Sequence, residues 1–289
     1  MVVHEVRERH VVLPGVDGEL RGVLVEPDVA AGAADAADAE DAADAADRAP
    51  GTTRTTGTSG TTGTTGTTGT VGLPAIVVVP EIDGFCAGTV AAARRLAEAG
   101  YVALALDLYA PYGSAPALRG YADTIAWLDR LNDRRQLSDL VQALGWLRKL
   151  PGVDPARVAI VGFSIGGRYG MMLTTEPHGL RAVVAFYSRP WPGAEIADVA
   201  LAPGKHVAQF TAPVCAVFGA EDDLVPISMV DDFRRLLTQH PTLAHEVHLF
   251  PGRHFFNNES RPRRYNSESA EKAWDIALDF LATQMAHAN

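Results

Sequence analysis

The spacing of apolar and polar residues predicts two strands first and then a regular alternation of strands and helices. Val2–Leu13 and Glu19–Val25 are rich in valine and leucine and are predicted as strands. The turn residues Pro14–Gly18 lie between them, so we expect a hairpin. Leu73–Pro80 is an unbroken apolar run with β-branched residues, which indicates a strand buried on both faces of a parallel sheet.

After residue 80 the period of the apolar residues switches repeatedly between that of a strand and that of a helix. The further predicted strands are Tyr101–Ala105, Val158–Val161, Ala182–Phe186, Val214–Phe218 and His245–Phe250. The predicted helices are Gly88–Ala99, Tyr121–Arg130, Leu137–Lys149, Ile165–Leu173, Ile227–Gln239 and Ser267–Ala286. Repeated βα units imply a mostly parallel sheet with helices on both faces. We therefore expect a single α/β domain over residues 1–289.

One segment, from about residue 30 to residue 70, interrupts this pattern. It begins as an Ala/Asp tract and continues as a Thr-Thr-Gly repeat, without large apolar side chains. Such a composition cannot offset the entropy lost on ordering, so we expect a disordered low-complexity insertion. It is either a neutral expansion, which we favour because nothing in it is chemically specific, or an arm that binds a regulator or partner.

Composition and charge narrow the class of protein. The chain is 47% hydrophobic and 21% charged, as expected for a globular protein with a large core. Half of the formal charge of −10 lies between Asp28 and Thr70, and no basic patch is present, which argues against a nucleic-acid partner. No apolar run reaches the length of a membrane span. The charged start of the chain and two separate cysteines, Cys86 and Cys215, favour a cytoplasmic protein.

The most specific motif is Gly162-Phe163-Ser164-Ile165-Gly166-Gly167, directly after the predicted strand Val158–Val161. A serine between glycines in a strand-to-helix turn is the pattern of a nucleophile elbow. The turn would expose the Ser164 hydroxyl at the end of the sheet, with the first N–H groups of the next helix beside it. A serine hydroxyl needs a base, and the base needs an orienting group.

Two loops at the carboxyl ends of later strands offer these partners. Glu221, Asp222 and Asp223 follow Val214–Phe218, although acids in this position also cap or solvate the start of a helix. His254 follows the last predicted strand in a loop that contains glycine. The order Ser, Asp, His along the chain, each after its own strand, is that of an α/β-hydrolase triad.

With these motifs the chain resembles the dienelactone hydrolase family of α/β-hydrolases. The resemblance rests on the elbow and on residues 79–84, 107–110, 219–222 and 252–256. It implies that Asp222 rather than Asp223 is the acid, and that Glu81 lies near the nucleophile. It also implies that the backbone N–H groups of Ile82 and Ile165 form the oxyanion hole.

The chain departs from the best-known members at three positions. Those members have a cysteine where Ser164 stands, and two arginines that hold a substrate carboxylate where this chain has Pro111 and Asn258. Arg168, Arg253 and Arg261 are the candidates nearby to replace them. The resemblance therefore carries the triad over more securely than the substrate.

Aromatic residues around these motifs are candidates for a substrate pocket, or they pack the loops: Phe85, Tyr109, Phe255 and Phe256. Cys86 is expected to be a small apolar filler. No histidine and carboxylate cluster has ligand spacing along the chain, so we expect no metal and no cofactor.

We expect a serine-dependent hydrolase of a small ester or lactone, related to carboxymethylenebutenolidase, that works through an acyl-enzyme. A small molecule is its expected partner, without nucleic acid or membrane, and the chain is expected to be a monomer or a small homo-oligomer. The alternatives are a peptidase or acyltransferase on the same fold, or a binding protein with a relict site.

Overall fold

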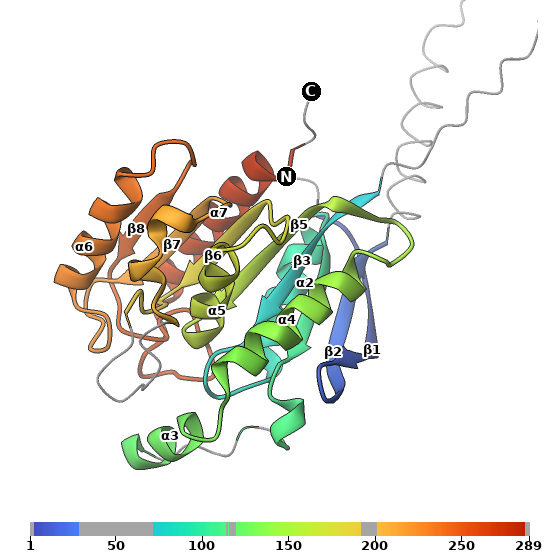
Figure 1. Ribbon diagram of the computed structural model, residues 1–289, viewed down its shortest axis with the longest axis horizontal. Coiled ribbons are helices and arrows are strands. Elements are labelled where there is room, and N and C mark those ends of the chain that lie inside the picture. Colours follow the sequence, from blue (N-terminus) through green and yellow to red (C-terminus); the bar gives the residue numbers. More distant parts are fainter. Residues whose placement is uncertain (1–2, 29–71, 114, 116–119, 192–200, 287–289) are drawn as a thin grey trace, which may run out of the picture.

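A computed structural model describes residues 3–28, 72–113, 115, 120–191 and 201–286 (Figure 1). The expected insertion at 30–70 lies outside the described residues. The strands are β1 (Val6–Gly15), β2 (Gly18–Pro27), β3 (Leu73–Val79), β4 (Val102–Asp107), β5 (Val153–Phe163), β6 (Ala182–Phe186), β7 (Val214–Gly219) and β8 (Glu246–Phe250). The helices are α2 (Ala87–Glu98), α3 (Tyr121–Leu128), α4 (Asp133–Leu147), α5 (Ile165–Leu173), α6 (Ile227–Thr238) and α7 (Ser267–Gln284). Short 3₁₀ turns are η1 (Ala110–Tyr112), η3 (Pro203–Lys205) and η4 (Val207–Gln209).

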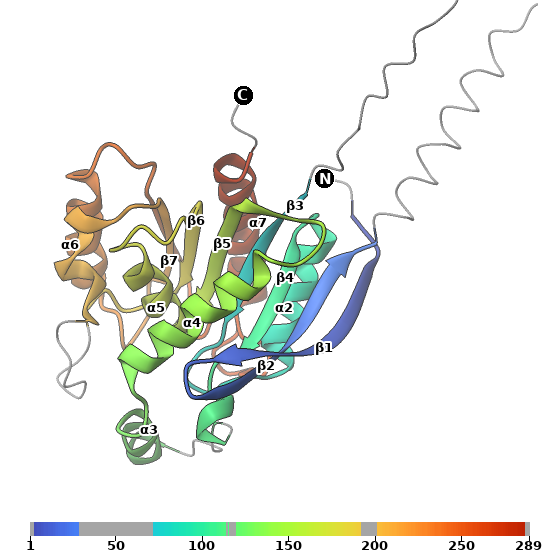
Figure 2. The ribbon, with the colours of Figure 1, turned by 45° about the vertical axis from the view of Figure 1, so that its right-hand side comes forward.

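These strands form one sheet in the order β1-β2-β4-β3-β5-β6-β7-β8. The hairpin β1–β2 and the pair β2–β4 are antiparallel, and all other pairs are parallel. Helices α4 and α5 cover one face, and α2 and α7 cover the other (Figures 1 and 2). The inner strands β6 and β7 are buried at every position, because both of their faces lie under helices. The expected α/β architecture is confirmed.

Among the described helices, the start of α4 is the one that differs from its prediction by more than one residue. Helix α4 begins at Asp133, four residues before the predicted start, because the Asn132 side chain accepts a hydrogen bond from the Arg135 backbone N–H at 3.1 Å. Asn266 caps α7 in the same way, through the N–H of Ser269 at 3.1 Å. The Asn132 cap lies ahead of the apolar periodicity from which α4 was predicted, whereas α7 begins at its predicted residue, Ser267.

Aromatic packing joins the sheet to α7. The Phe163 and Phe186 rings stack at 5.1 Å between centroids, and Phe186 lies 5.2 Å from the ring of Trp274. Phe163 is the last residue of β5 and Phe186 the last of β6, so this cluster fixes the carboxyl ends of the two strands.

The described chain leaves β2 and enters β3 at the same edge of the sheet, the one opposite Ser164. Val25 of β2 and Ile76 of β3 both pair with Ala103, near the start of β4. Residues 29–71 therefore connect two points at the amino edge of the parallel strands, whereas Ser164 follows the carboxyl end of β5.

Candidate active site

The backbone at Ser164 has the shape that the elbow motif predicts. Its φ is 49° and its ψ is −115°, a conformation that costs a residue other than glycine roughly 1–3 kcal/mol. A Cβ on Gly166 would lie 2.4 Å from the Pro80 carbonyl oxygen, and one on Gly162 would lie 2.5 Å from the backbone of Gly166. The glycines are therefore needed so that α5 can start directly against the end of β3.

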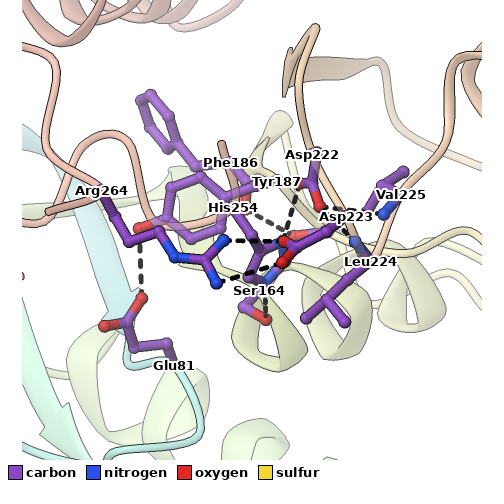
Figure 3. Close-up of polar contacts among 11 residues, drawn as sticks. Glu81, Ser164, Phe186, Tyr187, Asp222, Asp223, Leu224, Val225, His254 and Arg264 are labelled. Atoms are coloured by element: carbon purple, nitrogen blue, oxygen red, sulfur yellow. Dashed lines mark hydrogen bonds and ion pairs between the residues drawn. The ribbon is translucent and has the colours of Figure 1, made fainter. Parts of the chain in front are cut away.

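Ser164, His254 and Asp222 form one chain of hydrogen bonds (Figure 3). The Ser164 Oγ lies 3.0 Å from His254 Nε2, and His254 Nδ1 lies 2.7 Å from Asp222 Oδ2. A carboxylate can only accept, so Nδ1 carries the proton of the neutral ring. Nε2 is then free to accept the proton of the serine hydroxyl.

The structure distinguishes between the two neighbouring aspartates. Asp222 is turned inward, and its Oδ1 accepts the backbone N–H groups of Leu224 at 2.8 Å and Val225 at 2.9 Å. Asp223 is turned outward and makes a two-point ion pair with Arg264 at 2.8 and 3.1 Å, which holds the pKa of Asp223 below its ordinary value. Only Asp222 contacts His254 (Figure 3).

Glu81 is buried next to the hydrogen-bonded triad, and Tyr187 contacts both Glu81 and His254. The Tyr187 hydroxyl donates to Glu81 Oε2 at 3.2 Å, while the Tyr187 ring meets the ring of His254 at 5.1 Å between centroids (Figure 3). Asn258 donates its amide N–H to the other oxygen of Glu81. Burial, and then the charge of Asp83, raise the pKa of Glu81 to about 7 despite these two donors.

The role of Tyr187 and the hydrogen bond from Asn258 to Glu81 were not predicted from the sequence. Tyr187 directly follows β6 and has a φ of 40°, so the rule that functional groups gather at the carboxyl ends of strands could have indicated it. In the sequence, Asn258 was noted only as a position where the best-known family members have an arginine. Its contact with Glu81 joins loops far apart in the chain, which no local pattern reveals.

The four aromatic pocket candidates divide into two groups. Tyr109 and Phe256 have no exposed surface, so they pack the loops and do not line an open pocket. Phe255, 9% exposed, lies 4.3 Å from the His254 ring. Phe85 is half-buried and packs against the core.

The three candidate arginines for replacing the family pair also differ in position. Arg168 is buried and donates to Asp133 at 2.8 Å, so it supports the start of α4. Arg253 is exposed. Arg261 pairs with Asp83 and lies 4.1 Å above the centre of the Phe255 ring, which brings a guanidinium next to the aromatic neighbour of His254.

A cavity of about 340 Å³ lies between α2 and α7. Phe163, Tyr187 and Trp274 form its apolar wall, and Glu81 reaches it. Cys86, expected to be a filler, lines this cavity as the residue that precedes α2. Ser164, Asp222 and His254 do not line it.

A mostly parallel sheet with Ser164, Asp222 and His254 after β5, β7 and β8 is the arrangement of an α/β-hydrolase. The family model described as the dienelactone hydrolase family matches residues 62–285. The chain therefore belongs to the dienelactone hydrolase family and is a hydrolase of that kind.

Curated relatives agree with this family. The chain is 30% identical to a Bradyrhizobium protein named as a probable 2-oxo-3-(5-oxofuran-2-ylidene)propanoate lactonase, over 72% of this chain and 83% of that one. It is 31% identical to a Yersinia pestis protein, named by inference a carboxymethylenebutenolidase, over 72% of this chain and 77% of that one.

Solved structures agree with the fold. A Klebsiella pneumoniae subsp. pneumoniae structure classed as a dienelactone hydrolase matches with a TM-score of 0.74 and 24% identity, over 96% of this chain and 99% of that one. The acylaminoacyl peptidase of Pyrococcus horikoshii matches with a TM-score of 0.64 and 16% identity, over 100% of this chain but only 43% of that one. In the part of the chain that is described, no helix is long and apolar enough to cross a membrane.

Proposed function

We propose that the protein hydrolyses a small carboxylic ester or lactone, with Ser164 as nucleophile, His254 as general base and acid, and Asp222 as the group that orients His254. The observation that carries the proposal is the continuous hydrogen-bond chain from Ser164 Oγ through both His254 nitrogens to Asp222. Serine hydrolases require this connection, because the hydroxyl is a weak nucleophile until a base takes its proton.

In the first half of the reaction His254 Nε2 takes the proton of Ser164 as Oγ bonds to the substrate carbonyl carbon. The carbonyl oxygen becomes an oxyanion and accepts hydrogen bonds from the backbone N–H groups of Ile82 and Ile165. Ile165 is the first residue of α5, and such a position has an N–H group without a partner inside the helix. The imidazolium then gives its proton to the leaving alkoxide oxygen, the ester bond breaks, and the acyl group stays on Ser164.

In the second half His254 takes a proton from water, whose oxygen bonds to the acyl carbon. The second tetrahedral oxyanion collapses, the bond to Oγ breaks, and the proton on His254 returns to Ser164. Asp222 remains ionised throughout and stabilises the imidazolium in both halves. The two backbone donors that fix Asp222 hold it in the orientation that this requires.

For the substrate we propose a small ester or lactone, in line with the lactonase name of one curated relative. Position 258, where the best-known members have an arginine that holds a substrate carboxylate, carries a neutral asparagine in this chain. The Asn258 amide donates its hydrogen bond to Glu81, so this position offers no cation to a substrate carboxylate. Arg261 lies over the ring of Phe255, the aromatic neighbour of His254, and is a cation that a substrate carboxylate could meet. A screen of neutral esters, neutral lactones and dienelactone separates these substrates.

The test compares the parent with Ser164→Ala on p-nitrophenyl acetate. Loss of the nucleophile of a comparable triad lowers kcat by on the order of 10⁶, so the variant should be inactive. Equal rates in the two proteins would remove Ser164 from the mechanism. A fluorophosphonate probe should label the parent at Ser164, and a protein that takes no label and hydrolyses no ester would be a relict binding protein.

A further inference from the structure

Three potential metal ligands of different chemistry meet on the last two strands of the sheet, away from Ser164. These are the thiol of Cys215 on β7 and the Glu246 carboxylate and His248 imidazole on β8, and their ligand atoms all lie within 4.8 Å of one another. The sheet register explains this meeting, because Cys215 pairs with Glu246, and His248 is the next residue of β8 on the same face.

The cluster faces α7 at the amino ends of the strands. Val217, two residues after Cys215, pairs with both Phe186 and His248. Because Phe186 contacts Trp274 of α7, this set of alternate residues points toward that helix. The carboxyl end of β7 is four residues further along than Cys215, roughly 13 Å at the rise of a strand. The cluster is therefore separate from Asp222 and His254.

The ligand set balances the charge of a divalent ion. A thiolate and a carboxylate supply two negative charges, and a neutral imidazole adds a third ligand without charge. A dication among them leaves no net charge in a partly buried place, where an unbalanced charge is costly. Sulfur, nitrogen and oxygen ligands together are typical of Zn²⁺, which also accepts water as a fourth ligand.

We propose that Cys215, Glu246 and His248 bind one Zn²⁺ ion. The sequence did not reveal this site, because its ligands come from two strands and show no motif spacing along the chain. On binding, the Cys215 thiol loses its proton to solvent and its sulfur bonds to the metal, together with His248 Nε2 and one oxygen of Glu246.

Small side-chain movements suffice to reach this geometry. The His248 Nε2 and Glu246 Oε2 atoms are 2.7 Å apart, whereas the ligand atoms of a tetrahedral zinc site are about 3.5 Å apart, as follows from metal–ligand bonds of about 2.0–2.3 Å. Rotation of these two half-exposed side chains opens their hydrogen bond and leaves a path for the ion from solvent. Burial raises the pKa of the Cys215 thiol, and a bound metal offsets this because it stabilises the thiolate directly.

The experiment uses the full chain, stripped with a chelator, and ZnCl₂ alone as the probe. Calorimetry should give one Zn²⁺ per chain, and Co²⁺ in its place should give a thiolate-to-cobalt charge-transfer band. Cys215→Ala and His248→Ala should each remove the stoichiometric binding and the band. If Cys215→Ala does not fold, the half-exposed His248→Ala variant still decides the question.

The chain offers two matched controls among its described residues. Glu176 and His178 form a pair with the same spacing as Glu246 and His248, at 3.5 Å, so His178→Ala should leave zinc binding unchanged. Cys86→Ala removes the other cysteine and should also have no effect. Absence of stoichiometric zinc binding in the parent, or full binding by Cys215→Ala, would overturn the proposal.

Discussion

Tyr187 donates its hydroxyl to the buried carboxylate of Glu81 at 3.2 Å. The same side chain packs its ring edge-on against His254. One residue after β6 therefore couples a titratable group on one side to the proposed catalytic base on the other.

Removal of this hydroxyl tests the coupling. Tyr187→Phe keeps the ring against His254 but deprives Glu81 of one of its two donors. A hydrogen bond to a buried charged group is worth about 1.5–3 kcal/mol, so we expect a free energy of unfolding lower by about that amount at pH 8.5, where Glu81 is mostly ionised. Urea denaturation at pH 8.5 and pH 5.5 measures it. The loss should be smaller at pH 5.5, and an equal loss at both values would show that the hydroxyl does not act through the charge of Glu81.

Glu81 should also make the stability of the protein depend on pH. Its folded pKa of about 7 lies above the ordinary value of 4.5, so the stability that it contributes is full below about pH 4.5 and is lost as pH rises through about 7. Glu81→Gln removes this titration. Relative to the parent, the variant should gain up to about 3 kcal/mol between pH 4.5 and pH 8.5, since one pKa unit corresponds to about 1.4 kcal/mol. Parallel stability curves for the two proteins across this range would contradict the shifted pKa.

Two adjacent aspartates should differ widely in their effect on activity. Asp222→Asn replaces the acceptor of His254 Nδ1 and favours the wrong tautomer, which in a comparable triad lowers kcat about 10⁴-fold. Asp223→Asn removes only a surface ion pair with Arg264 and should leave kcat within about twofold, since such pairs contribute about 0–1 kcal/mol. Rates of p-nitrophenyl acetate hydrolysis decide between the two residues. A larger loss of activity in Asp223→Asn than in Asp222→Asn would show that Asp223 is the acid of the triad.

The close approach of α5 to β3 makes Gly166 sensitive to any side chain. In Gly166→Ala the new Cβ would lie 2.4 Å from a backbone carbonyl oxygen that cannot move freely. We expect a loss of at least about 3 kcal/mol in the free energy of unfolding, at the upper end of overpacking costs. Gly145→Ala is the control, because Gly145 lies in the last turn of α4 with nothing within 4 Å of its Cβ, and it should raise stability by about 0.4–1 kcal/mol. Thermal melts of both variants measure the contrast.

The sequence predicts those parts of the molecule that depend on local pattern or chain order. Apolar periodicity placed the central strands, and the glycines around Ser164 placed the turn, because each is set by neighbours within a few residues. His254 and the acidic loop Glu221–Asp223 could be selected because parallel strands bring their carboxyl ends together at one edge, and the family resemblance then indicated Asp222. The role of Asn258 and the meeting of Cys215 with His248 depend instead on which loops and strands become neighbours, and on side-chain direction, so they emerge only in three dimensions.

The connection between β2 and β3 has a consequence for how the chain can change over time. Val25 and Ile76 flank the same residue, Ala103, so they lie about 10 Å apart across β4 at the usual strand separation. A few residues can span that gap, which makes the long connection dispensable for closing the sheet. Its ends leave from the edge opposite Ser164, so repeats can be gained or lost there without displacing the triad. A protein in which a short Gly-Ser link replaces residues 30–70 should keep its melting temperature and its esterase rate, and natural selection would then leave the length of this connection free to drift.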